Sequence, residues 1–234
     1  MRLAIFDLDE TLIAKDSDHL WGEFLVEEGL VDPQVFLKSR QALSEAYVRG
    51  DMVFQTYINH SLNPILHLTP TEQEALAKRF TELKLIDHIY PEAMTLIEHH
   101  KKMGDTCLVI TAALTFLSRH ISYHFPIDFH IGSDVHLCPK GGLTLEAKGV
   151  PSFQEGKVQR LLEWLDDKDH SLAGSHFYSD SSNDIPLLEF VEHPIVVNPD
   201  ARLKERALAK GWPILTLKHP SHEPDERHPV TAAD

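Results

Sequence analysis

The chain has 234 residues, 42% of them hydrophobic, which suffices for one substantial core and a smaller appended domain. Its formal net charge of -14, without a run rich in Lys or Arg, argues against nucleic acid as a partner, because contacts to phosphate dominate that affinity. No apolar stretch is long enough to cross a bilayer, so we expect no membrane partner. The first strand begins too early to leave room for a signal peptide, and two cysteines do not make a disulfide framework. These features predict a cytoplasmic protein.

The first predicted element is a short apolar strand over residues 3–6 that runs directly into Asp7 and Asp9. Side chains alternate along a strand, so both carboxylates leave on the same side, at the carboxyl edge where α/β sheets bind ligands. Such a pair repels itself unless a cation or a shared proton relieves it, and Mg²⁺ prefers oxygen ligands. Because most isolated D-x-D triplets are solvated turns, the functional interpretation depends on features further along the chain.

The segment from residue 15 to 89 has apolar residues at helical rather than strand spacing and predicts an inserted helical unit. Pro33 suits the first turn of a helix, and Asp51 and Thr71 are plausible N-terminal caps. The predicted helices cover residues 17–29, 33–48, 51–61 and 71–85.

The chain then returns to alternating elements, with a helix over residues 91–103 and an apolar strand over 106–111. The strand ends at Thr111 and is followed by Ala112 and a helix from residue 115. A hydroxyl and free backbone N–H groups at such a turn can hold a phosphate oxygen. In the alternative interpretation, Thr111 merely caps the helix.

Two further polar features follow in the last third of the chain. Lys157 lies at the start of a predicted amphipathic helix, where a lone Lys is ordinarily solvated. An apolar strand over residues 176–179 then runs into Asp180, Asn183 and Asp184. Asp184 is also placed to cap the next helix, a role compatible with a functional one.

The alternation of strands and helices predicts an α/β fold with a Rossmann-like, mostly parallel sheet and helices on both faces. Most of the 16 histidines, including the adjacent His99 and His100, are predicted surface residues. The polar segment from residue 218 predicts a disordered tail. The remaining elements are strands over 129–135 and 193–197, a hairpin within 136–148, a helix over 200–210 and a last element over 213–217. The predicted units are a core of residues 1–14 and 90–217, the insertion 15–89 and the tail 218–234.

Together, these polar strand ends resemble the four motifs of the haloacid dehalogenase superfamily of phosphohydrolases. Their joint order over residues 3–190 is far more specific than any single motif. The resemblance implies a Rossmann-like core and an inserted helical cap of the C1 type, which closes over the site, excludes water and selects the substrate. The motifs are matched, in chain order, by Asp7, Asp9 and Thr11, by Thr111, by Lys157, and by Asp180 with Asp184.

The resemblance also implies catalytic roles for the matched residues. Asp7 would be the nucleophile that attacks phosphorus and becomes an aspartyl phosphate. Asp9 would protonate the leaving alcohol and then take a proton from the hydrolytic water. Thr111 and Lys157, together with Ala112, would hold the transferring phosphoryl group.

A magnesium site follows from the same resemblance. Mg²⁺ would be held by the carboxylates of Asp7 and Asp180 and by the backbone carbonyl of Asp9. Asp184, with Asn183, would orient the motif lysine or support the waters on the metal. One metal ion and one ammonium supply the positioning and charge neutralisation that phosphoryl transfer requires.

Within the superfamily, the chain resembles subfamily IB, the branch of the phosphoserine phosphatases, in its N-D-x-P-L-L sequence from Asn183. Glu10 replaces a common Gly of the first motif, and we expect no loss of chemistry because its side chain need not face the metal. Ala112 and Ala113 replace the usual glycines of the second motif, and their methyl groups would crowd the amino-acid end of phosphoserine. The D-S-D-H-L-W sequence from Asp16 resembles members assigned as histidinol-phosphate phosphatases. Histidinol phosphate is therefore the leading specific substrate, ahead of phosphoserine or another small phosphate ester.

Four residues lie at the hinge into the cap: Asp16, Asp18, His19 and Trp21. In the functional interpretation they meet the distal end of the substrate, and the acidic pair suits a cationic tail. In the alternative, Trp21 packs the first cap helix and Asp18 caps it.

Other activities differ in what they require of these residues. A dehalogenase needs neither a metal nor the second Asp of the first motif, so Asp9 and Asp180 argue against it. A phosphotransferase or mutase would keep every motif and stays open. A non-catalytic protein that binds a phosphate ligand is disfavoured, because a pure binder has little use for the nucleophile Asp7. The sequence makes no prediction of oligomeric state.

Overall fold

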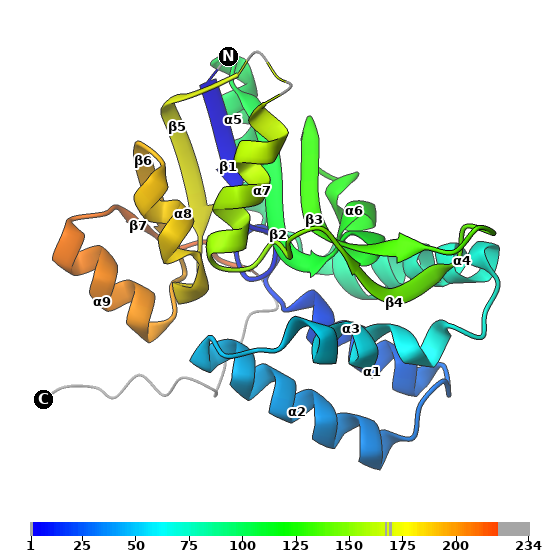
Figure 1. The fold of residues 1–234 in the computed structure, drawn as a ribbon. Coiled ribbons are helices and arrows are strands. Elements are labelled where there is room, and N and C mark those ends of the chain that lie inside the picture. Colours follow the sequence, from blue (N-terminus) through cyan, green and yellow to red (C-terminus); the bar gives the residue numbers. More distant parts are fainter. Residues whose placement is uncertain (1, 167, 169, 220–234) are drawn as a thin grey trace, which may run out of the picture.

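A parallel sheet dominates the computed structural model, which describes residues 2–166, 168 and 170–219. The described residues form seven strands in the order β4-β3-β2-β1-β5-β6-β7 (Figure 1). Every neighbouring pair is parallel except β3 and β4, which form the predicted antiparallel hairpin. The strands are β1 (Arg2–Phe6), β2 (Thr106–Leu114), β3 (Phe129–Leu137), β4 (Leu143–Lys148), β5 (Ser171–Ser179), β6 (His193–Val197) and β7 (Ile214–Leu215).

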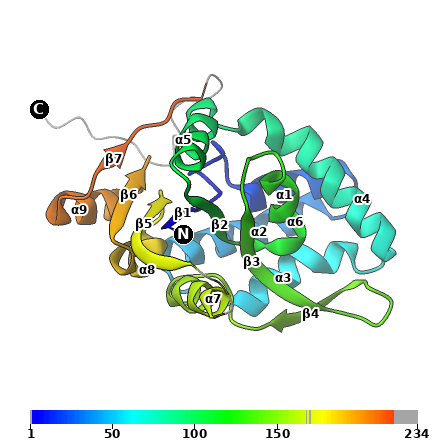
Figure 2. The same ribbon diagram turned by 90° about the horizontal axis from the view of Figure 1, so that it is seen from above.

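Helices cover both faces of this sheet, as predicted (Figure 2). In β1, the side chains of Leu3 and Ile5 pack on one face and those of Ala4 and Phe6 on the other, and all four are fully buried. The Leu3 face packs against α7, α8 and α9, and the Phe6 face against α5 and α6. These helices are α5 (Pro91–Lys102), α6 (Thr115–Ser122), α7 (Glu155–Leu165), α8 (Ile185–Phe190) and α9 (Ala201–Lys210). The predicted α/β fold is confirmed.

The inserted helices lie beyond the carboxyl ends of the strands (Figure 1). Their apolar core contains Trp21, Phe24 and Phe80, all buried, and it is continuous with the Phe6 face of the sheet. Trp21 also contacts Phe116 of α6, with ring centroids 6.2 Å apart. The helices are α1 (Ser17–Glu27), α2 (Pro33–Arg49), α3 (Phe54–Leu62) and α4 (Pro70–Phe80). The division into cap and core at residues 15 and 89 stays a prediction.

The predicted caps Asp51 and Thr71 are wrong. Helix α3 begins three residues after Asp51 and has no side-chain cap. Helix α4 begins after Thr69, which forms a capping box with Glu72, because this pair satisfies the free N–H groups of the first turn reciprocally. The predicted single helix to residue 85 is also interrupted, since a π-helical turn, Thr81–Leu85, follows α4.

The prediction of a surface position is wrong for His100, although His99 is exposed. His100 follows the buried Ile97 by almost one helical turn, and only 4% of its surface is exposed. Its ring nitrogens lie 2.8 Å from a carboxylate oxygen of Asp105 and 2.8 Å from the hydroxyl of Tyr178. Polar partners on both sides of the ring allow this histidine to be buried.

Two other predictions concern the C-terminal tail and the cysteines. Of the tail, only Lys218 and His219 belong to the described residues, so the predicted disorder of 220–234 lies outside them. Cys107 is buried in β2, and Cys138 is partly exposed in the β3–β4 turn. None of the helices placed in the structure combines the length and the apolar character needed to span a membrane.

Candidate active site

Four separate elements bring the predicted catalytic residues Asp7, Thr111 and Lys157 and the predicted metal ligand Asp180 to one edge of the sheet. Asp7 follows β1 and Asp180 follows β5, while Thr111 lies in β2 and Lys157 in the first turn of α7. The backbone N–H of Asp7 donates to the carbonyl of Tyr178 in β5 at 2.9 Å, which continues the sheet pairing up to the carboxylate. All four predicted side chains are buried, with exposures between 1% and 8%.

Lys157 bridges two carboxylates rather than facing solvent. Its ammonium donates to Asp7 Oδ1 and to Asp184 Oδ2, each at 2.7 Å, and the residue is 1% exposed. Burial opposes the charge, but the two carboxylates raise the pKa of Lys157 above its ordinary value. Ser179 also donates to Asp184, at 2.7 Å. Asp184 occupies the N-cap position of α8, as predicted, but its carboxylate accepts from Lys157 and Ser179 instead of the helix N–H groups.

Thr11 of the first motif fixes Asp180 of the fourth. Its hydroxyl donates to Asp180 Oδ1 at 3.0 Å, and the backbone N–H of Asp180 donates back to Thr11 Oγ1 at 3.1 Å. Thr11 is 1% exposed, so both bonds lie in the protein interior. The sequence alone assigned Thr11 no separate role, and only its position in the first motif indicated that it belongs to the site.

Negative charge exceeds positive charge in this site. Burial raises the pKa of Asp7 to about 6, although Lys157 opposes the rise. Burial and neighbouring carboxylates raise the pKa of Asp9 and that of Asp180 well above the usual range. Glu10 lines the same pocket, and its charge contributes to the raised pKa of Asp180. A divalent cation would relieve this repulsion.

The donor set fits Mg²⁺. Among the residues that the structure places, no three His, Cys, Asp or Glu side chains are grouped as a metal site. Mg²⁺ does not need such a group, because it usually binds one or two carboxylates and keeps several waters. The carboxylates of Asp7 and Asp180 and the backbone carbonyl of Asp9 would supply hard oxygen ligands of this kind.

Thr111 is 1% exposed and lies within β2, which continues to Leu114. The pairing of β2 with β3 shifts register after Ile110, and Thr111 and Ala112 line the pocket. Thr111 Oγ1 accepts from the backbone N–H of Ala113 at 3.2 Å, so its own hydrogen is available to a ligand. The alternative that Thr111 caps α6 is wrong, because Leu114 occupies the cap position.

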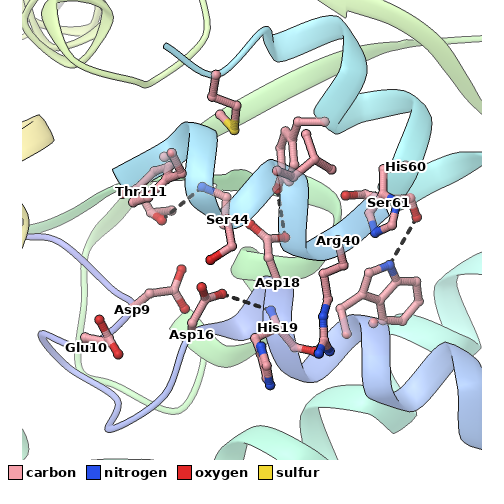
Figure 3. Close-up of a pocket in the computed structure, with 18 of the residues that line it drawn as sticks. Asp9, Glu10, Asp16, Asp18, His19, Arg40, Ser44, His60, Ser61 and Thr111 are labelled. Carbon is pink, nitrogen blue, oxygen red and sulfur yellow. Dashed lines mark hydrogen bonds between the residues drawn. The ribbon is translucent and has the colours of Figure 1, made fainter. Parts of the chain in front are cut away.

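The four predicted hinge residues line the same pocket (Figure 3). Asp16 caps α1 by accepting from the backbone N–H of His19 at 2.9 Å, so the alternative that Asp18 is the cap is wrong. Asp18 instead accepts from the hydroxyl of Tyr57 at 2.8 Å. Trp21 is 1% exposed, so it packs α1, as the alternative proposed, and also contributes to the pocket wall.

A hydrogen-bonded bridge between α2 and the core escaped sequence reasoning. The Gln154 amide donates to the carbonyl of Gly50 at 3.0 Å and to Asn183 Oδ1 at 3.1 Å. Asn183 in turn donates to the carbonyl of Tyr47 at 2.9 Å. Gln154 has φ = 51°, a left-handed backbone that is costly for a residue other than glycine. No local pattern identifies these pairs, because Gln154 and Gly50 lie 104 positions apart.

The family model of haloacid dehalogenase-like hydrolases matches residues 4–189 of the chain. The protein belongs to this family. A histidinol-phosphatase of Neisseria meningitidis serogroup C is 36% identical over 219 residues, which cover 92% of this chain and 99% of that protein. A probable phosphatase of Mycobacterium tuberculosis is 28% identical over 221 residues, which cover 93% of this chain and 76% of that protein. This haloacid dehalogenase-like hydrolase is therefore a phosphoric monoester hydrolase.

A solved structure of a protein of unknown function from Bordetella pertussis Tohama I superimposes on this hydrolase with a TM-score of 0.83. It is 35% identical, and the match covers 92% of this chain and 97% of that one. A substrate-bound phosphoserine phosphatase has the same fold, with a TM-score of 0.62 at 18% identity over 90% of this chain and 98% of that one.

Proposed function

We propose that this hydrolase is a Mg²⁺-dependent phosphomonoesterase that acts on a small phosphorylated metabolite through an aspartyl-phosphate intermediate. The observation that supports the proposal most strongly is the buried Lys157 ammonium between Asp7 and Asp184. A structural salt bridge alone does not account for the surplus of buried carboxylates, whose desolvation is costly. A bound divalent cation does account for it, because it would offset the carboxylates and the charge of a phosphate ester.

In the first half-reaction, Asp7 attacks phosphorus, and the bond from phosphorus to the alcohol oxygen breaks. Asp9 gives its proton to that oxygen, and the raised pKa of Asp9 favours the protonated form that this step requires. The Thr111 hydroxyl donates to a phosphoryl oxygen, while Lys157 holds the attacking carboxylate in position. The product is the free alcohol and a phosphorylated Asp7.

In the second half-reaction, water attacks the phosphorus of the aspartyl phosphate. Asp9, now deprotonated, takes a proton from the water, and the bond from phosphorus to Asp7 breaks. Inorganic phosphate leaves, and both carboxylates return to their starting states. The bound Mg²⁺ would supply neutralisation of the charge on the phosphoryl oxygens.

Histidinol phosphate is the leading substrate in this proposal. The relative from Neisseria meningitidis, named a histidinol-phosphatase, is similar over nearly its whole length. Ala112 and Ala113 stand where phosphoserine phosphatases typically have glycines, which disfavours phosphoserine. A phosphotransferase would use the same residues, and the fate of the phosphoryl group separates the two activities.

The test is phosphate release from histidinol phosphate, phosphoserine and 4-nitrophenyl phosphate with Mg²⁺ or EDTA. We expect turnover that needs the metal and that falls by at least about 10³-fold in Asp7→Asn, since the nucleophile is lost. Circular dichroism would check that the variant is folded. Activity that persists in EDTA or in Asp7→Asn would refute the mechanism, and transfer of phosphate to an added alcohol without net release would indicate a transferase.

A further inference from the structure

The pocket extends from the catalytic carboxylates to an end formed by α1, α2 and α3 (Figure 3). The space between its walls, including the part open to solvent, is about 970 Å³. Asp7, Thr111 and Asp180 lie at the phosphoryl end. The walls at the other end include Asp18 and His60. The groups around these two residues indicate which chemical group of a substrate can bind there.

One carboxylate oxygen of Asp18 is held rigidly. The backbone N–H of Leu114 donates to the Tyr57 hydroxyl oxygen at 3.2 Å, and the Tyr57 O–H donates to Asp18 Oδ1 at 2.8 Å. This chain of bonds uses the only hydrogen of the hydroxyl and fixes the direction of the carboxylate. Within residues 2–166, 168 and 170–219, Asp18 Oδ2 has neither a hydrogen bond nor an ion pair.

Among the residues that the structure describes, no cation forms an ion pair with Asp18. Asp16 and Asp9 lie nearby with the same sign, and the three carboxylates converge on one space (Figure 3). Burial and the charge of Asp16 raise the pKa of Asp18 to about 7. A cation that lines this pocket, Arg40, donates to the backbone carbonyl of His19 at 3.2 Å. Asp18 is partly buried, and a carboxylate with one oxygen fixed and the other unpaired at the pocket wall is poorly stabilised until a cation binds it.

His60 offers a second acceptor in the same pocket. Ser39 donates its hydrogen to the carbonyl of Phe36 at 2.9 Å, so its oxygen accepts from His60 Nδ1 at 3.1 Å. This network assigns the neutral tautomer that leaves Nε2 as an acceptor. Burial and the charge of Arg40 lower the pKa of His60, which favours that neutral form. Nε2 is buried without a partner among the described residues, and the ring stacks on Phe36 with centroids 4.0 Å apart.

We propose that Asp18, held by Tyr57, is a specificity-determining residue that binds a protonated nitrogen at the distal end of the substrate, while His60 Nε2 accepts another N–H of the same group. The substrate class is therefore phosphate monoesters of short alcohols that carry a cationic nitrogen and no carboxylate. An anionic distal group is repelled by Asp16 and Asp18. This inference rests on the proposed phosphatase for the phosphoryl end, but it concerns separate residues.

The test compares Asp18→Asn with the wild type on histidinol phosphate, which has a cationic end, and on 4-nitrophenyl phosphate, which has none. The ratio of the two kcat/KM values should fall on the order of 10²-fold, mainly through KM for histidinol phosphate, because one partner of a desolvated charge pair is lost. The matched control is Asp32→Asn, which makes the same charge change at the exposed cap of α2 and keeps a capping side chain. It should leave the ratio unchanged.

Two outcomes would overturn the inference. One is an unchanged ratio in folded Asp18→Asn, and the other is wild-type enzyme that prefers phosphoserine, whose carboxylate would then pair with Arg40. If Asp18→Asn does not fold, Tyr57→Phe tests the same point, since it keeps the carboxylate but removes its hydrogen bond. Its ratio should fall by roughly 3- to 10-fold.

Binding without turnover separates this inference from the proposed function. Calorimetric titration with the alcohol L-histidinol needs no catalysis, and we expect binding that is at least about tenfold weaker in Asp18→Asn. Wild-type protein that binds L-histidinol through Asp18 but hydrolyses no ester would support the inference and refute the function. Hydrolysis of 4-nitrophenyl phosphate without Asp18-dependent binding of L-histidinol would support the function and refute the inference.

Discussion

Replacing Lys157 with Met removes a buried ammonium and leaves an unbranched side chain in its place. The ammonium makes two charge-assisted hydrogen bonds of 2.7 Å, to Asp7 and to Asp184. Each such bond contributes about 1.5–3 kcal/mol, and breaking a buried ion pair costs about 3–5 kcal/mol. We therefore expect Lys157→Met to lower the free energy of unfolding by about 4 kcal/mol at pH 7.5, because two buried carboxylates lose their countercharge.

The deficit should depend on pH in a defined direction. The pKa of Asp7 is about 6 in the folded protein against 3.8 for the ordinary group, and losing Lys157 raises it further. A carboxyl whose folded-state pKa is raised contributes stability at low pH that is lost as pH rises through that pKa. At pH 5 the variant binds this proton in the folded state, so we expect the deficit to shrink by roughly half.

Urea unfolding of metal-free protein at pH 7.5 and pH 5 measures both quantities. The control is Lys101→Met, which removes a partly exposed ammonium from its pair with Asp128 and should cost less than about 1 kcal/mol. A deficit in Lys157→Met no larger than that of the control would refute the reasoning. So would a deficit that grows as the pH is lowered.

Three other predictions concern the metal, the bridge to α2 and acid stability. Mg²⁺ should raise the melting temperature of the wild type but not of Asp180→Asn, because a ligand stabilises only the state that binds it; equal shifts would contradict the metal site. Gln154→Ala loses the hydrogen bonds to Gly50 and Asn183, and steady-state kinetics should show a KM that is several-fold higher. An unchanged KM would exclude a role for this bridge in closing the cap over the site. Burial lowers the pKa of His130 to about 4, so its contribution to stability holds above pH 6.5 and falls by about 2 kcal/mol towards pH 5. In urea unfolding, His130→Gln should therefore lose less stability than the wild type between pH 6.5 and pH 5. Equal losses in the two proteins would contradict this prediction.

The sequence allowed the phosphoryl end of the site to be predicted because its residues follow local rules. Asp7 and Asp180 end apolar strands, and Lys157 opens an amphipathic helix, so the strand period and the helix period place each of them. Parallel strands then carry these ends to one edge. The order of the motifs, rather than any single one, made the prediction specific.

The remaining contacts depend on packing between elements that are distant in the chain. Thr11 meets Asp180 across 169 positions, and Tyr57 meets Asp18 across 39, so neither pair has a spacing that a sequence pattern can carry. The strand through Thr111 was predicted to end there because small residues follow it. Pairing between β2 and β3 resumes at Leu114 and extends the strand by three residues, a tertiary effect that local propensity does not contain.

The indole of Trp21 restricts how the cap can open. It packs against Phe24, Phe80 and Phe116 and joins α1 to α6, so a rigid lift of all the inserted helices would expose it to water at a cost of about 2–3 kcal/mol. Helix α2 has Phe36 as its only buried residue among those described, and it is therefore cheaper to move. We therefore expect α2 alone to move when a ligand enters, while α1 keeps its position. Amide hydrogen exchange should then be faster in residues 33–49 than in 17–27.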